Sequence, residues 1–429
     1  MSAPAGTAAP ARGGLLRHHD FRLLWAGETT SRLGTGITAV ALPLVAVGTL
    51  DAGPLAMGVL GAAAWLPWLL IGLHAGALVD RLPRRAVMIT CDLACLGTLI
   101  AVPVAAWFGW LSIGLLLAAV LVLGAASVFF STAYQAYVPF LLDKGRLAEG
   151  NAKLQGSEQV ANMAGPGAGG LIAQWFGGLA GLFVDALTFL ASAVSLHLIR
   201  AREPRRRVES RPGDMRREIG EGLRFVGRDR YLRVLALAAS VDNLILNGYM
   251  ALIVLFLVRE VGVPLGAVGL LLTADAVGGL LGAVLAARLA KRLGTARAML
   301  VCSLGATPFG LLVPLAGNGF GLLFFVVGMA VPAAGMVVGN VVVNGFRQTY
   351  CPPELLGRMF TSSRFLQYGV MPAGAVLGGA LGAAIGLRAA LWVLFAAAVL
   401  GKGVRLIGPI RRTRDFPSEY PVAASNPTR

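Results

Sequence analysis

The chain has 429 residues, of which 56% are hydrophobic and only 14% are charged, and its mean hydropathy is +0.73. Soluble domains carry far more charge, so this composition excludes an ordinary soluble enzyme and indicates a membrane protein. The net charge of +16 would suit a nucleic-acid partner, and the placement of the basic residues decides whether one is needed.

Twelve apolar runs long enough to span a membrane lie between Phe21 and Ile410. When both termini are placed on one side, 34 of the 37 Lys and Arg fall on that side, and the exceptions are Arg32, Arg259 and Arg388. By the positive-inside rule, we expect the termini and the even-numbered connections in the cytoplasm and the protein in the inner (cytoplasmic) membrane. Topology therefore explains the charge without a nucleic-acid partner.

A basic segment divides the chain. The expected fold is an all-α membrane protein with two six-helix halves at 21–199 and 232–410, cytoplasmic tails at 1–20 and 411–429, and a linker at 200–231. In the linker, apolar residues recur at helical spacing, which predicts an amphipathic helix on the anionic cytoplasmic lipid surface. These residues are Met215, Ile219, Leu223 and Val226.

The first run carries two charges, Glu28 and Arg32, which share a helix face because they are four residues apart. Charges inside a span are costly and are functional candidates by default. A carboxyl whose proton affinity changes as an arginine approaches could couple transport to protons, although a fixed pair that neutralises two buried charges is equally consistent.

Further proton-coupling candidates lie in later runs. Asp242 could instead act as a helix cap, and Glu158 could instead pair with the region of Lys153 or Arg146. The candidates are Asp242, Asp275 and Glu158, with Asp92 and Asp185 as weaker ones.

The connection after the second run contains Gly76, Asp80, Arg81, Arg84 and Arg85. The dipole at a helix C-terminus disfavours an anion, so Asp80 needs an arginine or the N-terminus of another helix as its partner. Gly76, one turn earlier, allows a second helix to approach. We expect these five residues to form a gating motif. The stretch resembles the signature of the major facilitator superfamily, except that Pro83 stands where that family usually has glycine.

The fifth run contains small residues and then Gly165-Pro166-Gly167-Ala168-Gly169-Gly170. Small residues allow close helix contact, and a proline removes a backbone hydrogen bond and bends the helix. The run resembles the antiporter motif of the superfamily, with Ser157 and Ala161 in place of its two leading glycines. The resemblance implies efflux in exchange for an ion, usually a proton, and a kinked packing helix is the structural alternative.

Traces of an internal repeat support two related halves. Tyr134-Gln135-Ala136-Tyr137-Val138-Pro139 leaves the fourth run, and Arg347-Gln348-Thr349-Tyr350-Cys351-Pro352 leaves the tenth. Together with Phe21-Arg22-Leu23-Leu24-Trp25, these motifs are similar to the branch of the superfamily that contains the enterobactin exporter and the macrolide efflux proteins. The resemblance implies two halves related by a pseudo-two-fold axis and alternating access between them.

Cargo contacts are expected from the first, fourth, seventh and tenth runs, which line the central cavity in this superfamily. Two pairs of amides share a helix face amid apolar residues, and such a mixture suits an amphipathic organic molecule. Hydrogen bonds between helices are the alternative role for each amide. The candidates are Asn243, Asn247, Asn340 and Asn344.

The sequence thus predicts a secondary transporter that exports a small amphipathic compound, such as a drug, an antibiotic or a siderophore-like molecule, against protons. Its expected partners are this substrate, protons and anionic lipids, and we expect it to function as a monomer. We expect no catalytic residues, cofactor or metal site, because the chain lacks a phosphate-binding Gly-x-x-x-x-Gly-Lys-Ser/Thr motif and metal-ligand spacing of its four cysteines. A proton-coupled importer and a membrane-embedded enzyme are the alternatives.

Overall fold

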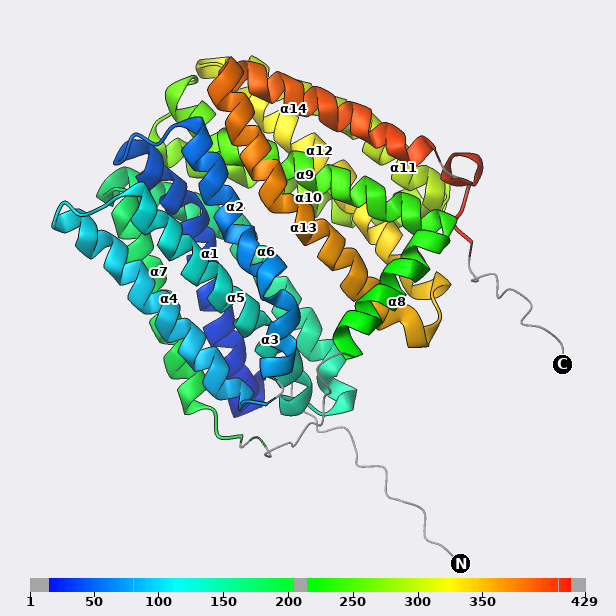
Figure 1. The fold of residues 1–429 in the computed structure, drawn as a ribbon, viewed down its shortest axis with the longest axis horizontal. Helices are drawn as coiled ribbons and strands as arrows, with labels where there is room; N and C mark the ends of the chain where they lie inside the picture. The colour runs from blue at the N-terminus through cyan, green and yellow to red at the C-terminus, as the bar shows by residue number, and fades with distance from the viewer. Residues whose placement is uncertain (1–14, 80, 202, 204–213, 408, 418–429) are drawn as a thin grey trace, which may run out of the picture.

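The computed structural model describes residues 15–79, 81–201, 203, 214–407 and 409–417. The described chain is built almost entirely of helices in two groups (Figure 1). The N-terminal half contains α1 (His19–Gly48), α2 (Pro54–Leu70), α3 (Gly72–Val79), α4 (Arg84–Trp107), α5 (Ile113–Leu141), α6 (Leu147–Phe176) and α7 (Gly178–Leu198). The C-terminal half contains α9 (Arg230–Arg259), α10 (Leu265–Leu293), α11 (Thr295–Ala306), η3 (Thr307–Leu315), α12 (Leu322–Tyr350), α13 (Pro353–Ile385), α14 (Leu387–Gly401) and η5 (Lys402–Leu406).

These helices make twelve spans, because α2 with α3, α11 with η3, and α14 with η5 each form one span. Within the described residues, ten helices are long and apolar enough to cross a membrane. The other two spans fall short for local reasons: the second is divided near Ile71, and α6 carries polar side chains such as Gln155 and Glu158. Length at about 1.5 Å per residue still allows α6, with 30 residues, to cross a core of about 30 Å.

Successive spans run in opposite directions, so the molecule has two ends. We call the end at which α1 begins, and at which the connections after α3, α5, α10 and α12 lie, the basic end, and the other the opposite end. Arg259 and Arg388, two basic residues at the opposite end, are each held by an acid: Arg259 forms an ion pair with Asp51, and Arg388 Nε lies 3.1 Å from Glu260 Oε2. Exposed aromatic side chains also mark this end, as expected of a membrane interface, and they are Trp107, Phe108, Trp110, Trp175, Phe176 and Phe320.

The two halves share one hydrophobic core toward the opposite end but have separate cores toward the basic end. The shared core joins residues such as Val40 and Leu182 of the N-terminal half to Leu252 and Phe325 of the C-terminal half. At the basic end, one core contains only N-terminal residues around Tyr137 and another contains only residues from 226 to 416. The structure is therefore closed at the opposite end, and the halves separate toward the basic end.

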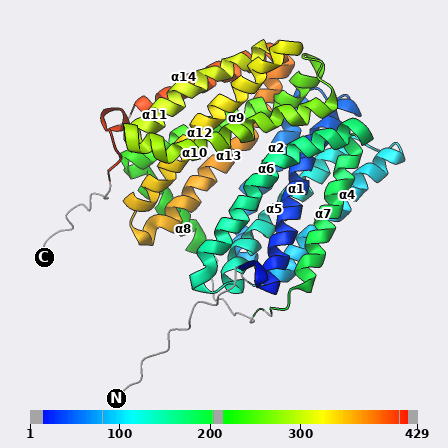
Figure 2. The ribbon, with the colours of Figure 1, turned by 180° about the vertical axis from the view of Figure 1, so that it is seen from behind.

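Helix pairs α2–α13 and α6–α10 make the main contacts between the halves (Figures 1 and 2). In both pairs a glycine lies against a glycine. The Cα atom of Gly379 would lie 2.8 Å from a Cβ atom placed on Gly58, and the Cα atom of Gly170 would lie 2.7 Å from one placed on Gly269. Any larger residue at these positions would force the helices apart.

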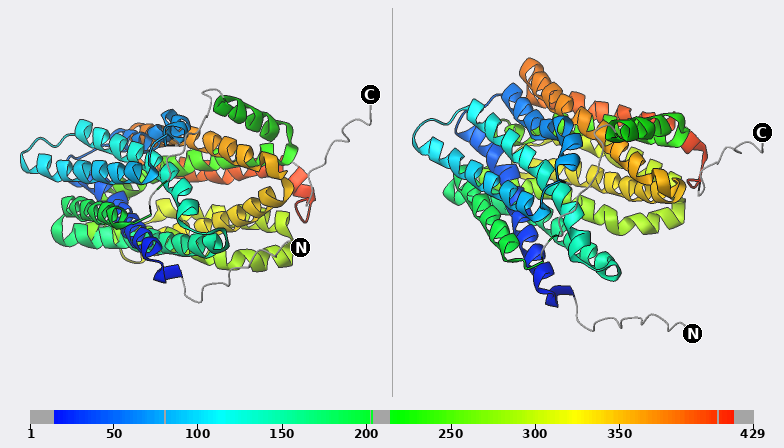
Figure 3. Two further views of the ribbon diagram at one scale, coloured as in Figure 1. Left: turned by 90° about the horizontal axis from the view of Figure 1, so that it is seen from below. Right: turned by 60° about the horizontal axis from the view of Figure 1, so that its bottom comes forward.

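The linker contains α8 (Asp214–Arg228) at the edge of the C-terminal half (Figure 3). This helix packs against α13 and α9, and Val226 is buried in the core of that half. At least part of its apolar face therefore contacts protein. The side chains of Met215 and Ile219 lie outside the described residues.

Gly269→Ala tests the close contact between the halves. The new Cβ atom would lie 2.2 Å from the carbonyl oxygen of Pro166, so the helices must shift. We expect a loss of about 1–3 kcal/mol in the free energy of unfolding, seen as a lower midpoint of thermal unfolding in detergent. Gly305→Ala on α11 is the matched control, because no atom lies within 4 Å of its Cβ position. Equal midpoints for the two variants would contradict this assignment.

Candidate transport cavity

A polar cavity of about 530 Å³ lies between the halves toward the basic end. Helices α1, α2, α5 and α6 of the N-terminal half line it, and α13 contributes Arg364 and Tyr368 from the other half. We call this cavity the polar chamber, because most of the side chains that line it are polar or charged. The lining residues used below are Glu28, Arg32, Trp68, Tyr134, Glu158, Arg364 and Tyr368.

Arg32 joins two carboxylates in the polar chamber. Its Nε atom lies 2.6 Å from Glu28 Oε1 on α1, and its Nη1 atom lies 3.5 Å from Glu158 Oε1 on α6. Glu28 is buried, whereas Arg32 and Glu158 are partly exposed. Glu28 and Arg32 thus lie on the same face of α1, as their spacing predicted. The sequence-based alternative for Glu158 differs from the structure, because Lys153 pairs with Glu149 at 3.6 Å instead.

A second cavity, of about 450 Å³, lies deeper between the halves and is mostly apolar. Residues of α1, α2, α5, α9 and α13 line it, including Met57, Leu60, Val120 and Met250. Three of its lining side chains can form hydrogen bonds: the hydroxyl of Thr38 on α1, the amide of Asn247 on α9 and the indole N–H of Trp65 on α2. We call this cavity the apolar chamber.

Three aromatic side chains lie where the two chambers meet. Trp65 lines the apolar chamber, and Trp68 and Tyr368 line the polar chamber. The ring of Tyr368 on α13 stacks on Trp65 with centroids 5.7 Å apart and lies 5.1 Å from the ring of Trp68, both on α2. This aromatic group therefore bridges the halves at the boundary between apolar and polar surroundings.

The four candidate amides differ in their placement. Asn247 lines the apolar chamber, and its Nδ2 atom donates to the carbonyl oxygen of Asn243, 2.9 Å away in the same helix. Asn243 similarly donates to the carbonyl oxygen of Ala239. Asn340 and Asn344 are exposed on α12 and line neither chamber. Of the four expected spans, α1, α5 and α9 line the chambers and α12 does not, while α2, α6 and α13 line them in addition.

The gating motif is only partly described. Asp80 lies outside the described residues, and Gly76 is in α3, which packs against α5. Arg84 Nη1 donates to the carbonyl oxygen of Ala136 in α5 at 3.0 Å, and the guanidinium of Arg85 donates to the carbonyl oxygen of His197 in α7. Arg81 is exposed. Two arginines of the motif thus tie the α3–α4 connection to neighbouring helices.

The antiporter-like run lies in α6, which remains helical through Pro166. Its glycines face two different neighbours. Gly165 meets the backbone of Gly36 in α1, and Gly169 meets the backbone of Ile37, whereas Gly170 faces α10 of the other half. The glycines of this run thus allow α6 to pack closely against α1, which lines both chambers, and against α10 of the other half.

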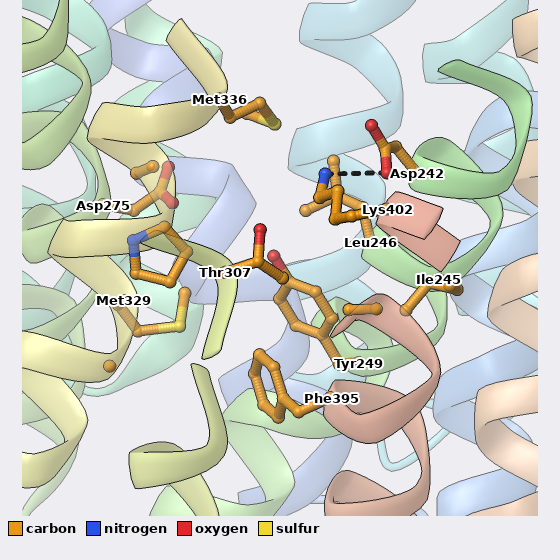
Figure 4. A pocket seen from close by; sticks show the side chains of 14 residues that line it. Asp242, Ile245, Leu246, Tyr249, Asp275, Thr307, Met329, Met336, Phe395 and Lys402 are labelled. Atoms are coloured by element: carbon orange, nitrogen blue, oxygen red, sulfur yellow. Dashed lines mark hydrogen bonds and ion pairs between the residues drawn. The ribbon is translucent and has the colours of Figure 1, made fainter. Parts of the chain in front are cut away.

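The C-terminal half has its own small cavity, of about 50 Å³, among α9, α10, α12, η3 and α14 (Figure 4). Asp242 accepts hydrogen bonds from Lys402 Nζ at 2.7 Å and from Arg405 Nη2 at 2.5 Å. Asp275 lies across the cavity from this group. The capping alternative for Asp242 differs from the structure, because Asp229 caps α9 by accepting hydrogen bonds from the backbone N–H groups of Tyr231 and Leu232.

Sequence reasoning missed the aromatic group and the two cations beside Asp242. The Trp-x-x-Trp spacing at 65 and 68 places both rings near one face of α2, and this was the available signal. Tyr368 is distant in the sequence, so nothing local indicated that it joins them. Lys402 and Arg405 read as the cytoplasmic end of a span, yet both side chains are largely buried.

Comparisons with known proteins agree with this architecture. The nucleoside transporter NupG has a TM-score of 0.73 at 10% identity, with 92% of this chain and 99% of that chain covered. A bacterial homologue of the iron transporter ferroportin, in an inward-facing state, has a TM-score of 0.70 at 18% identity, with 92% and 99% covered. These likenesses show the fold.

Two proteins found by comparison of sequences are more similar to this chain in sequence than these two solved structures are. The multidrug efflux pump Tap of Mycolicibacterium fortuitum is 32% identical over 422 residues, which cover 92% of this chain and 97% of Tap. Macrolide efflux protein A of Streptococcus pyogenes is 22% identical over 380 residues, covering 86% and 90%. Residues 8–419 match the family described as transmembrane secretion effectors. The chain belongs to this family of major facilitator superfamily transporters.

Proposed function

We propose that this protein exports small amphipathic organic molecules from the cytoplasm by alternating access. The observation that carries the proposal is the pair of adjoining chambers, one apolar and one polar, between halves that are closed at the opposite end. A molecule with an apolar and a polar part matches this division. A sugar or an inorganic ion would need denser polar coordination than the apolar chamber offers.

The direction of transport rests on two supports. The basic end carries nearly all of the Lys and Arg, and by the positive-inside rule this distribution supports an orientation in the inner membrane with the basic end facing the cytoplasm. The relatives Tap and macrolide efflux protein A are both named as efflux proteins. The cytoplasm-facing polar chamber is then the entrance for cargo.

Release requires the opposite end to open. The contacts that must separate there are the glycine contacts of α2 with α13 and α6 with α10, and the ion pair of Asp51 with Arg259. Glycine contacts have no interlocking side chains, so the helices can part at these points, and the shared apolar core divides between the halves as they separate. Rocking of the halves would then close the polar chamber and expose the apolar chamber to the outside.

Proton exchange would drive the cycle through Glu28. In the present arrangement Arg32 lies between Glu28 and Glu158, so two carboxylates share one cation. A proton on Glu28 would release Arg32 to Glu158, and departure of the proton would restore the pair with Glu28. The charge on Glu28 can therefore be exchanged between a proton and an arginine, which is what coupling requires. Asp242 and Asp275 remain candidates for a second coupling site in the C-terminal half.

The remaining roles extend this proposal. Gly76, Asp80 and the neighbouring arginines would act as the cytoplasmic gate, and α6 with Gly165, Pro166, Gly169 and Gly170 would favour exchange over uptake. The basic linker would bind anionic lipids, and the single chain would function as a monomer, because both chambers are formed within one chain.

Tyr368→Ala tests the cargo assignment. Removing the ring deletes its contacts with Trp65 and Trp68, so we expect export of ethidium, a planar aromatic cation, to fall roughly tenfold. Export of cetyltrimethylammonium, an aliphatic cation, should fall much less. Tyr368→Phe keeps the ring and serves as the control. Export would be measured in reconstituted vesicles, and an equal loss for both cations would contradict the assignment. Absence of export of either cation by the unmodified protein would contradict the proposed function itself.

Glu28→Gln tests the coupling. The amide cannot exchange a proton, so we expect ethidium export driven by a pH gradient to be lost. Exchange of labelled for unlabelled ethidium without a gradient should continue, because the chambers keep their shape. Glu149→Gln, at the basic end and outside both chambers, is the control. Retained gradient-driven export by the Glu28 variant would move the coupling role to another carboxyl.

A further inference from the structure

A row of polar side chains lies between α1 and α7, inside the N-terminal half. Asp185 of α7 is at its centre: its Oδ2 atom accepts a hydrogen bond from Thr38 of α1 at 2.5 Å, and its Oδ1 atom accepts one from Thr188 at 2.9 Å. Asp185 is only 1% exposed. Toward the basic end, Ser192 of α7 is buried where α7 packs against Gly27 of α1, and Ser31 of α1 is also buried.

The close approach of α1 and α7 is built around this carboxyl. A Cβ atom on Gly34 of α1 would lie 2.1 Å from Asp185 Oδ1 and 2.0 Å from Thr188 Oγ1. The carboxylate and the hydroxyl therefore occupy the space that any side chain at position 34 would fill. A fit of this kind shows that the polar row is specified by the sequence of both helices and is not a chance burial.

A second carboxyl, Asp92 of α4, joins the row near Ser192. Asp92 is 1% exposed, and its Oδ2 atom has no hydrogen-bond partner among the described residues. No lysine or arginine in the described part of the chain forms an ion pair with Asp92 or Asp185. A buried carboxyl without a cation is stable as the neutral acid, so both can hold a proton.

Asp185 lies nearest the opposite end, whereas Asp92 and Glu28 lie at about the same depth from the basic end. Asp185 is seven residues into α7, about 10 Å from the opposite end, and Asp92 is eight residues into α4, about 12 Å from the basic end. Glu28 is nine residues into α1, about 14 Å from the basic end, where it lines the polar chamber. Thr38 lines the apolar chamber at the other end of the row. The row thus connects the two chambers without passing through the aromatic group.

We propose that Asp185, Asp92 and Glu28 form one proton path beside the cargo chambers, with Asp185 as the loading group and Glu28 as the release group. The proposal rests on the proton exchange inferred above and deepens it, because it separates the route of the proton from the route of the cargo. Two mobile species can then use the same half without competing for one carboxyl.

The path moves one proton per cycle. Each proton moves to a carboxylate that is already vacant, beginning at Glu28. When the halves leave the state open to the basic end, the Glu28 carboxylate takes the proton of Asp92, and the vacated Asp92 carboxylate takes the proton of Asp185, with hydroxyl groups or water between them. The vacated Asp185 carboxylate then takes a proton from water outside, past the Thr38 hydroxyl, when the apolar chamber opens. When the polar chamber opens again, Glu28 gives its proton to water and pairs with Arg32, so one proton has crossed and the charge of the row is restored.

Other titratable or charged groups surround the row. Arg32 and Glu158 face Glu28 from α1 and α6, and they set its charge in the state open to the basic end. The remaining titratable neighbours are Cys91 and Cys95 of α4 and Tyr134 of α5, whose thiol and phenol groups ordinarily carry no charge near pH 7.

Asp185→Asn and Asp92→Asn test the path in reconstituted vesicles. Asparagine keeps the shape of aspartate and can still accept the hydrogen bond from Thr38, but it cannot carry a proton. We expect gradient-driven ethidium export, and the proton uptake recorded by a pH-sensitive dye, to fall at least about tenfold in each variant. Exchange of labelled for unlabelled ethidium without a gradient should be unchanged. Asp143→Asn, exposed in the loop after α5, is the matched control.

Several outcomes would overturn the path. Full coupling in both asparagine variants, with coupling lost in the Glu28 variant, would mean that Glu28 exchanges protons directly with the chambers. If the rate of export by the unmodified protein does not depend on the pH gradient, the proposed exchange for protons is itself contradicted. If Asp185→Asn does not fold, Asp92→Asn decides, because Asp92 lines neither chamber: intact exchange with reduced coupling supports the path, and intact coupling contradicts it.

Discussion

The contact of glycine on glycine between the halves is the constraint on which the rest of the structure depends. Gly58 against Gly379 and Gly170 against Gly269 bring two pairs of helices to backbone contact toward the opposite end. Because the helices meet there, one apolar core spans both halves, and because they diverge toward the basic end, each half needs a core of its own. The two chambers occupy the space that this divergence leaves.

Polarity inside the molecule follows the same geometry. Side chains near the basic end can be reached by water, so the Glu28–Arg32–Glu158 group is tolerated there. Deeper residues lie against the shared core and are mostly apolar, with the aromatic group of Trp65, Trp68 and Tyr368 at the boundary. Aromatic rings suit such a boundary, since each combines a large apolar surface with a polar atom.

The sequence predicted the features that depend on local pattern. Apolar run length and the placement of basic residues indicated twelve helices in two halves, and helical spacing placed Glu28 and Arg32 on one face. Features made by distant residues could not be predicted in this way. The burial of Asp185 depends on Gly34, whose missing side chain leaves room for the carboxylate, and the role of Lys402 beside Asp242 depends on how α14 packs on α9. Periodicity reports which face of a helix is buried but not which partner it meets.

Opening of the opposite end is the central claim of this account, and a reversible cross-link tests it most directly. Asp51 and Arg259 lie on different halves and form an ion pair at that end. Both would be replaced by cysteine in a chain whose four native cysteines have been substituted, and a short cleavable thiol cross-linker would join them. The account predicts that ethidium export by reconstituted vesicles stops on cross-linking and returns on cleavage. Export that continues at its normal rate in the cross-linked protein would contradict it.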